Sequence, residues 1–363
     1  MSALHPVDPE DLAPGIPLAD NLYNRQGVLI AARGSVIDDP RRLAQLAGQG
    51  IYRRQDAHDM PFASPLEKLQ DLGSHYSHVL EDTAGLRPEG IERVARGLRL
   101  VMQAYPELGI GMALRLTLPS ASQRHSLFVA MVATLLARSL DMGEEAEQAV
   151  ACAALTMNLS SHALQDTLTC GVQPDAEQYR LLRSHPADSA QMLLDAGVDD
   201  PVWLQSVLQH HENLDGSGYP RGLPGEAILP EARVLRAADV WCALAAHRHN
   251  RIGRYPNHAL RVLFQRERGR LDDAVVLALR KLMGRYPPGT LVRLANRETA
   301  LVTRWFANRS NPDYVVSLLR PSGDALRWPE RRHTGRRFHA IRDYTYLPER
   351  HAPVDWDRVW AVA

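Results

Sequence analysis

The chain has 363 residues, which at roughly 150 residues per domain predicts two or three folding units. Apolar residues make up 45% of the chain and charged residues 23%, a globular composition that excludes a disordered or fibrous protein. The 42 basic residues balance the 42 acidic ones, so no net charge attracts the protein to nucleic acid or to an anionic membrane. With three cysteines, no secretory signal and no apolar run of roughly 18 residues, we expect a cytoplasmic protein without a membrane partner.

Changes of sequence pattern divide the chain into four stretches. Residues 1–62 contain short β-like runs separated by proline and glycine, which predict a small N-terminal α+β module. Apolar residues then recur at intervals of three and four, which predicts a helical linker over 63–119 and a helical domain over 120–290. Strand-like runs bounded by turn residues predict a β-rich C-terminal segment over 291–363. The predicted fold class is therefore mainly α, with these two modules on either side.

Capping signals place several helices inside the helical stretch. Asp175, with a glutamine three residues later, has the spacing of a capping box and predicts the start of a helix. We expect that helix to end before His185, because Pro186 predicts a helix break. Asp200, followed by a proline, predicts a second helix that ends near His211.

The adjacent histidines His210 and His211 stand at a predicted helix end, before an acidic, glycine-rich loop. Neighbouring helical residues point about 100° apart, so the two rings cannot simply stack on one face, but they could converge on one ion where this helix meets others. Imidazole nitrogen is a good ligand for Zn, Fe or Mn. Histidines are also favoured at helix C-termini by the helix dipole. The spacing alone leaves a metal site and a polar helix end equally open.

Asp239 shares the apolar stripe of its predicted helix with Leu235 and Cys242. A buried carboxylate must be paired, hydrogen-bonded or coordinated, because desolvating it alone costs several kcal/mol. Arg236 is expected on the wrong face to help. A metal ion or a histidine from another helix is the expected partner, and an ordinary buried ion pair is the alternative.

Five motifs of this region follow one another in chain order: His125-Ser126, His185-Pro186, His210-His211-Glu212, Asp215-Gly216-Ser217-Gly218-Tyr219-Pro220 and Ala238-Asp239-Val240. Taken together, they resemble the HD-GYP family over about residues 120–290. The resemblance implies a helical, metal-dependent phosphohydrolase domain that acts on the bacterial messenger cyclic di-GMP.

The resemblance also implies a set of metal ligands. By position, His125 and Asp239 would serve a first metal ion, and His185, His210 and His211 would serve a second. Paired metal ions polarise a phosphate and supply hydroxide in phosphodiester cleavage.

The sequence departs from the family where a His-Asp doublet is expected, because Met157 and Asn158 stand there. A thioether is a poor ligand for the ions that hydrolysis uses, and a neutral amide cannot bridge two cations as a carboxylate does. We therefore expect one metal site to be lost and at most one divalent ion, Fe, Mn or Zn, on the three later histidines. His162 and Asp166, four residues apart, are weaker candidates for replacement ligands.

The resemblance further implies two binding regions. Arg248 and Arg251 would bind nucleotide phosphates. The alternative is that these arginines only provide a solvated helix end. The loop after the histidine pair would dock a diguanylate cyclase (GGDEF) domain or another signalling protein, and a purely structural role for it stays open. The loop residues concerned are Asp215, Gly216, Gly218, Tyr219 and Pro220.

These patterns predict a degenerate HD-GYP protein that binds cyclic di-GMP, a protein partner or both, with little or no turnover. One alternative is a residual phosphodiesterase that uses a single three-histidine metal site. Another is an interaction scaffold whose site holds no metal. Nucleic acid is not an expected partner, since the arginine cluster over 327–342 is interpreted as a solvated surface.

Overall fold

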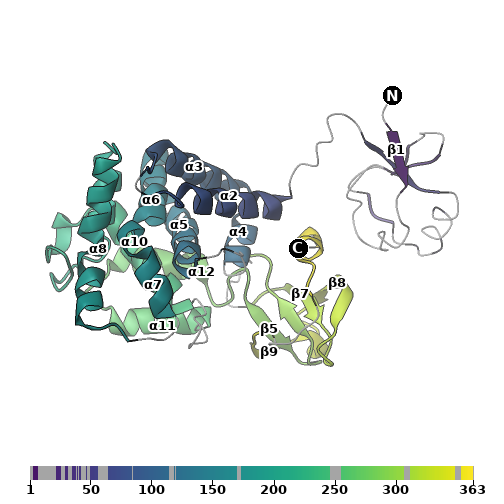
Figure 1. The fold of residues 1–363 in the computed structure, drawn as a ribbon. Helices are drawn as coiled ribbons and strands as arrows, with labels where there is room; N and C mark the ends of the chain where they lie inside the picture. Colours follow the sequence, from purple (N-terminus) through teal and green to yellow (C-terminus); the bar gives the residue numbers. More distant parts are fainter. Residues whose placement is uncertain are drawn as a thin grey trace. The chain divides into compact units, whose positions relative to one another are not determined.

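The structure is a computed structural model, and it describes most of the chain after residue 63. Described there are residues 64–362 except 84, 114–117, 119, 170–172, 246–254, 306–310 and 348–352. Before that point it describes residues 3–6, 22–25, 29–31, 35–37, 39, 41, 46 and 50–55. The chain divides into two compact units, built essentially from Met1–Ser64 and from the residues that follow (Figure 1). No helix in the described ranges is long and apolar enough to cross a membrane.

The N-terminal unit contains a small antiparallel sheet with the strand order β1-β4-β2-β3. Its strands are β1 (Ala3–Pro6), β2 (Leu22–Tyr23), β3 (Leu29–Ala31) and β4 (Tyr52–Gln55). Among its described residues, the buried apolar side chains are Leu22, Ile37 and Ile51.

Helices form the first and larger part of the second unit. They are α2 (Pro65–Val79), α3 (Pro88–Ala104), α4 (Pro106–Ala113), α5 (Ala121–Ser139), α6 (Glu144–Thr156), α7 (His162–Thr169), α8 (Ala176–Asp195), α9 (Pro201–Gln209), α10 (Pro230–Ala245), α11 (Pro256–Arg266) and α12 (Asp273–Met283). Short 3₁₀ turns follow α6 and precede α10, at η2 (Leu159–Ser161) and η3 (Gly225–Ala227).

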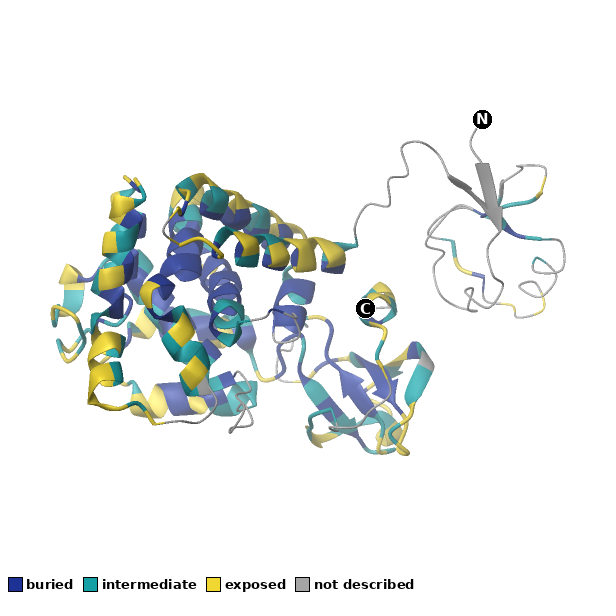
Figure 2. Cartoon of the chain, in the orientation of Figure 1, coloured by how far each residue is buried: buried dark blue, intermediate teal, exposed yellow. Residues whose placement is uncertain are grey.

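Helix α5 forms the centre of this helical domain. Every residue from 126 to 137 is buried, which is the pattern of a helix surrounded by others (Figure 2). Helices α6 and α10 both pack against it, and each is itself apolar over most of its surface. Helices α5, α6 and α10 carry or adjoin several of the candidate ligands.

Helix α8 confirms one prediction and corrects another. Its start is confirmed, since Asp175 and Gln178 form both hydrogen bonds of a capping box. The predicted break at Pro186 is wrong, because α8 continues through this residue to Asp195. Proline lacks the N–H that would bond the carbonyl four residues earlier, at Leu182. Here His185 Nδ1 donates to that carbonyl at 2.7 Å, so the proline frees an acceptor that orients the neighbouring imidazole.

Helix α9 follows the prediction closely. The side chain of Asp200 accepts hydrogen bonds from the backbone N–H groups of Val202 and Trp203, at 2.8 and 3.1 Å. The helix ends at Gln209, so the histidine pair comes directly after its last turn.

The C-terminal segment forms a second sheet, with the strand order β8-β7-β6-β5-β9. Its elements are β5 (Leu291–Leu294), β6 (Thr299–Leu301), β7 (Tyr314–Leu319), β8 (Ala325–His333), η4 (Arg337–His339), β9 (Ile341–Tyr344) and the helix α13 (Trp356–Val362). The predicted fold class is confirmed: a mainly helical protein with a small N-terminal sheet module and a β-rich C-terminal part.

Part of the arginine cluster belongs to this sheet. Arg332 donates to both carboxylate oxygens of Glu298, at 2.8 and 3.1 Å, and its side chain is largely buried. The Arg331 guanidinium lies 4.8 Å from the centre of the Tyr314 ring. These two arginines therefore stabilise the sheet, while Arg336 and Arg337 are exposed.

Candidate metal centre

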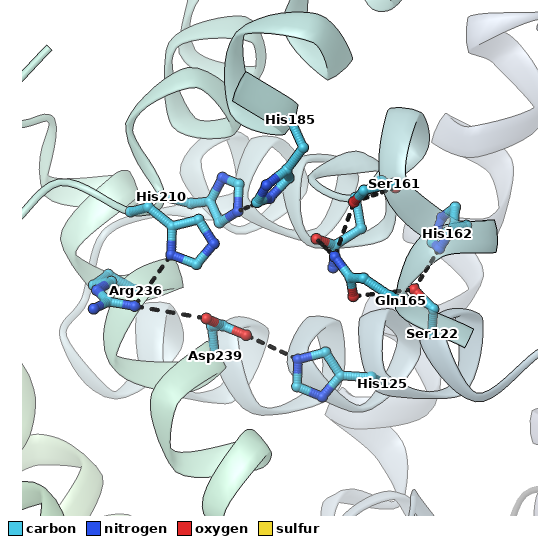
Figure 3. Close-up of polar contacts among 11 residues, drawn as sticks. Ser122, His125, Ser161, His162, Gln165, His185, His210, Arg236 and Asp239 are labelled. Atoms are coloured by element: carbon cyan, nitrogen blue, oxygen red, sulfur yellow. Dashed lines mark hydrogen bonds and ion pairs between the residues drawn. The ribbon is translucent and has the colours of Figure 1, made fainter. Parts of the chain in front are cut away.

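Four helical elements bring the predicted ligands to one place in the helical domain. His125 comes from the first turns of α5, His185 from the middle of α8, and Asp239 from α10. His210 and His211 follow the last turn of α9. Figure 3 shows the imidazoles of His125, His185 and His210 and the Asp239 carboxylate around one central space.

The imidazoles of His185 and His210 are fixed by backbone carbonyls. His185 Nδ1 donates to the Leu182 carbonyl at 2.7 Å, and His210 Nδ1 donates to the Val207 carbonyl at 2.6 Å. A carbonyl can only accept, so both rings carry their proton on Nδ1 and both Nε2 atoms present lone pairs. These two Nε2 atoms face each other at 3.1 Å.

Burial keeps both rings neutral. It lowers the pKa of His185, and burial with the neighbouring His185 charge lowers the pKa of His210 to about 3. Two facing lone pairs without a proton repel each other unless a cation lies between them. Imidazole nitrogens that share a metal at about 2.0–2.1 Å with tetrahedral angles lie roughly 3.3 Å apart. The pair therefore fits a divalent metal ion.

His211 lies close to this pair but is held differently. One nitrogen from each of the three rings lies within 4.8 Å of the others, and they form the one such group of three among the described side chains. Its Nδ1, however, accepts from Arg236 Nη1 at 3.2 Å. Its ring stacks on Tyr219, with the two ring centres 4.7 Å apart.

His125 and Asp239 pair with each other on the opposite side of the site. His125 Nε2 lies 2.8 Å from Asp239 Oδ1, so the expected histidine partner from another helix is present. Burial raises the pKa of Asp239, but the hydrogen bond and charge of His125 and the charge of Arg236 outweigh it and lower the pKa to about 2. The carboxylate is therefore ionised at neutral pH.

The expectation that Arg236 lies on the wrong face is wrong. Its Nη1 lies 3.8 Å from Asp239 Oδ2, and only 18% of its side chain is exposed. Residues three apart on a helix are neighbours, and the long arginine stem can curl around the intervening turn to reach the carboxylate.

The doublet position does not offer a second set of ligands. Met157 is fully buried in the main apolar core. Asn158 Oδ1 accepts from Gln165 Nε2 at 2.7 Å, and the same Gln165 nitrogen donates to Ser161 Oγ at 2.9 Å. The amide oxygen is thus engaged within a neutral network. The paired imidazoles of His185 and His210 fit a metal ion, whereas the doublet position offers no charged ligand.

His162 and Asp166 do not replace the doublet. His162 Nδ1 lies 2.7 Å from Ser122 Oγ, and Asp166 Oδ1 accepts from the Ser122 backbone N–H at 2.7 Å. Both side chains are therefore held at the start of α5. Figure 3 shows His162 beyond Ser122 and Gln165, away from Asp239 and His210.

This placement of His162 predicts a pH-dependent stability. Burial lowers its pKa from 6.5 to about 4, so the unfolded chain binds the proton more tightly. Stability should fall as pH decreases from 6.5 toward 4, by about 2 kcal/mol between pH 7 and pH 5. Urea unfolding of wild type and His162→Asn in metal-free buffer measures this. The variant should lose less stability over that interval, and an equal loss in both proteins would contradict the prediction.

The glycine-rich loop folds back on the histidine pair. Glu212 is buried, and its two oxygens accept from the backbone N–H groups of Arg221 and Leu223 at 2.7 and 3.0 Å. A Cβ at Gly218 would lie 2.4 Å from the Asn213 nitrogen, so only glycine fits this close approach.

The five loop residues predicted for docking differ in exposure. Asp215 Oδ1 accepts from the Ser217 backbone N–H at 2.9 Å, and Gly216 adopts a φ of +75°. Tyr219 packs inward on His211, while Asp215 and Pro220 are exposed. The loop's acidic start and its proline are thus the parts that a partner can reach.

The sequence analysis did not predict that Arg183 and Gln165 lie beside the centre, and it placed Arg236 on the wrong face. The Arg183 guanidinium lies 4.9 Å from the centre of the Tyr219 ring. The spacing of Arg236 to Asp239 along one helix was a usable signal for its position, whereas the contact made by Gln165 depends on how η2 and α7 turn. Arg248 and Arg251, the predicted nucleotide ligands, lie outside the described residues.

Comparison with known proteins agrees with this geometry. Residues 110–275 match the HD domain family. A cyclic di-GMP phosphodiesterase of Pseudomonas aeruginosa is 33% identical over 180 residues, which are 49% of this chain and 43% of that protein. The 3′3′-cGAMP-specific phosphodiesterase 1 of Vibrio cholerae is 32% identical over 159 residues, 42% of this chain and 36% of that protein.

A solved HDG"Y"P protein from Bdellovibrio bacteriovorus shares the fold. It matches with a TM-score of 0.51 at 16% identity, over 77% of this chain and 99% of that one. Residues 110–275 of this chain therefore match an HD domain, and the relatives that share this region are named as phosphodiesterases of cyclic dinucleotides. The chain spans less than half of the length of the curated relatives described above.

Proposed function

We propose that this chain is a degenerate HD-GYP protein that binds a cyclic dinucleotide with little or no turnover. The observation that carries the proposal is the state of Asn158, a neutral amide whose oxygen is already bonded to Gln165 at 2.7 Å. A neutral amide does not link two metal ions, and two-metal hydrolysis depends on such a link to hold both ions near the phosphate.

The names of the relatives support a class of ligand. They are named for hydrolysis of cyclic di-GMP or of 3′3′-cGAMP, which share a ring of two phosphodiesters and two purines. We propose the same class of ligand for this chain. Arg248 and Arg251 would bind its phosphates, because a guanidinium matches a phosphate with two parallel hydrogen bonds.

A residual one-metal phosphodiesterase is the second candidate, and the facing imidazoles of His185 and His210 favour it. A divalent ion bound there would polarise a phosphate oxygen and lower the pKa of a bound water. The protein's own part would be to hold the two Nε2 lone pairs in place through their backbone acceptors. Docking of a signalling protein on the loop is a further proposal, supported by the exposure of Asp215 and Pro220.

Elemental analysis of the purified full chain, calorimetry with cyclic di-GMP and 3′3′-cGAMP, and chromatography of the linear products separate these functions. We expect at most one metal ion per chain, nucleotide binding and negligible product. Two metal ions with rapid turnover would refute the proposal. One ion with slow turnover supports the second candidate, and a protein that binds neither metal nor nucleotide would be a scaffold.

The facing imidazoles give a direct prediction for metal binding. His185→Ala and His210→Ala should each weaken Mn²⁺ or Zn²⁺ binding by at least about tenfold, because each removes one of two oriented ligands. His78→Ala is the matched control, since this imidazole lies on α2 with 74% of its side chain exposed. Unchanged affinity in both site variants, measured by calorimetry, would place the metal elsewhere.

A further inference from the structure

We propose that Arg236 is a built-in cation that takes the place of one metal ion in this centre. The inference deepens the proposed function, because it explains how the charged side of the site remains balanced without a two-metal cluster. Metal binding is measured in the absence of nucleotide, so the inference can fail or hold independently of nucleotide binding and turnover.

The guanidinium of Arg236 lies between two of the predicted ligands. Its Nη1 lies 3.2 Å from Nδ1 of His211 and 3.8 Å from Oδ2 of Asp239, and both residues are predicted metal ligands. Its Nη2 donates to Asn213 Oδ1 at 3.4 Å, which ties the same group to the start of the loop. A divalent ion bound to His211 Nδ1 or to Asp239 Oδ2 would have to displace this group.

The charge of the guanidinium suits its surroundings. The Asp239 carboxylate is largely buried, with 13% of its side chain exposed, and lies 2.8 Å from His125 Nε2 and 3.8 Å from Arg236 Nη1. Such a carboxylate needs a cation nearby. Arginine stays protonated at any accessible pH, so it supplies this charge permanently. A divalent ion entering beside it would meet a positive charge in a poorly solvated place, where repulsion is strong.

Arg236 also fixes the proton position on His211. Because Arg236 can only donate, His211 Nδ1 must accept, and the neutral ring then carries its proton on Nε2. His185 and His210 carry theirs on Nδ1. Arg236 therefore leaves His211 no free lone pair for a metal, and reduces the three imidazoles to two ligands.

The test is metal binding by variants that separate charge from shape. Arg236→Met keeps most of the stem and removes the charge, whereas Arg236→Lys keeps a positive charge. We expect Arg236→Met to bind Mn²⁺ at least about tenfold more tightly than wild type, by calorimetry and elemental analysis. Arg236→Lys should remain near wild type. Equal or weaker binding by Arg236→Met would overturn the proposal, since it would make Arg236 a support for the ligands.

A second arginine of α10 provides the matched control. Arg233 donates to Asp272 at 3.1 Å and to the backbone carbonyls of Ile228 and Gly225, and none of these acceptors is a predicted metal ligand. Arg233→Met should leave Mn²⁺ affinity unchanged within about twofold, even if the thermal midpoint falls, because no charge beside the site is lost. A tenfold gain in this control as well would assign the effect to general loosening of α10 and overturn the proposal.

A spectroscopic measurement tests the same proposal on the wild-type chain. Long-range ¹H–¹⁵N spectra of metal-free protein distinguish the two neutral forms of each histidine. We expect His211 with its proton on Nε2, and His185 and His210 with theirs on Nδ1. In Arg236→Met, His211 should lose this preference. Wild-type His211 protonated on Nδ1 would contradict the contact with Arg236 on which the inference depends.

Discussion

Cyclic di-GMP hydrolysis should rise at least about 100-fold when Met157→His, Asn158→Asp and Arg236→Met are combined. Position 158 then gains a carboxylate that can link two cations, and position 157 gains an imidazole in place of a thioether. The third change removes the positive charge that would oppose a second ion. Gln165 donates to the present amide oxygen at 2.7 Å and can donate equally to an aspartate oxygen, so the local network should survive.

A variant without the Arg236→Met change makes this prediction specific. The Met157→His and Asn158→Asp pair alone should bind a second Mn²⁺ weakly, because the guanidinium of Arg236 still occupies its side of the centre. Met157 is fully buried, so thermal unfolding must show that its replacement leaves the fold intact. If the triple variant binds two ions per chain and is still inactive, the missing link is not what limits this protein.

Removing the buried Glu212 carboxylate should produce the largest loss of stability around the site. Glu212→Ala leaves the backbone N–H groups of Arg221 and Leu223 without their acceptors, at 2.7 and 3.0 Å in the structure. Unpaired donors to a charged acceptor cost about 2–3 kcal/mol in total, and the loop should detach from the histidine pair. Urea unfolding measures the first effect, and faster hydrogen exchange at 212–223 measures the second.

Two comparisons control for this effect. Glu212→Gln keeps one acceptor oxygen and should lose about half as much stability. Glu226→Ala removes an exposed carboxylate from the same stretch of chain and should change stability by less than about 0.5 kcal/mol. A loss in Glu226→Ala as large as that in Glu212→Ala would show that the loop responds to net charge and not to the buried hydrogen bonds.

Local features of the fold could be predicted because they depend on neighbouring residues. The capping box at Asp175 and the cap at Asp200 are made within three residues, so the sequence spacing specifies them. Pro186 shows the limit of such reasoning. A proline predicts a break, yet α8 continues through Pro186, and His185 uses the carbonyl that the proline leaves free.

The sequence by itself determined that this chain contains an HD-type helical domain, and it indicated which histidines and which aspartate belong to one site. It could do so because these motifs are defined by residue type and by order along the chain, and the sequence contains both. Only the tertiary structure decided which atoms of those residues are free. The hydrogen bonds from Gln165 to Asn158 and from Arg236 to His211 each connect separate elements of the fold. The rotamer of a long side chain depends on the groups that packing places within its reach, and the sequence does not contain that information.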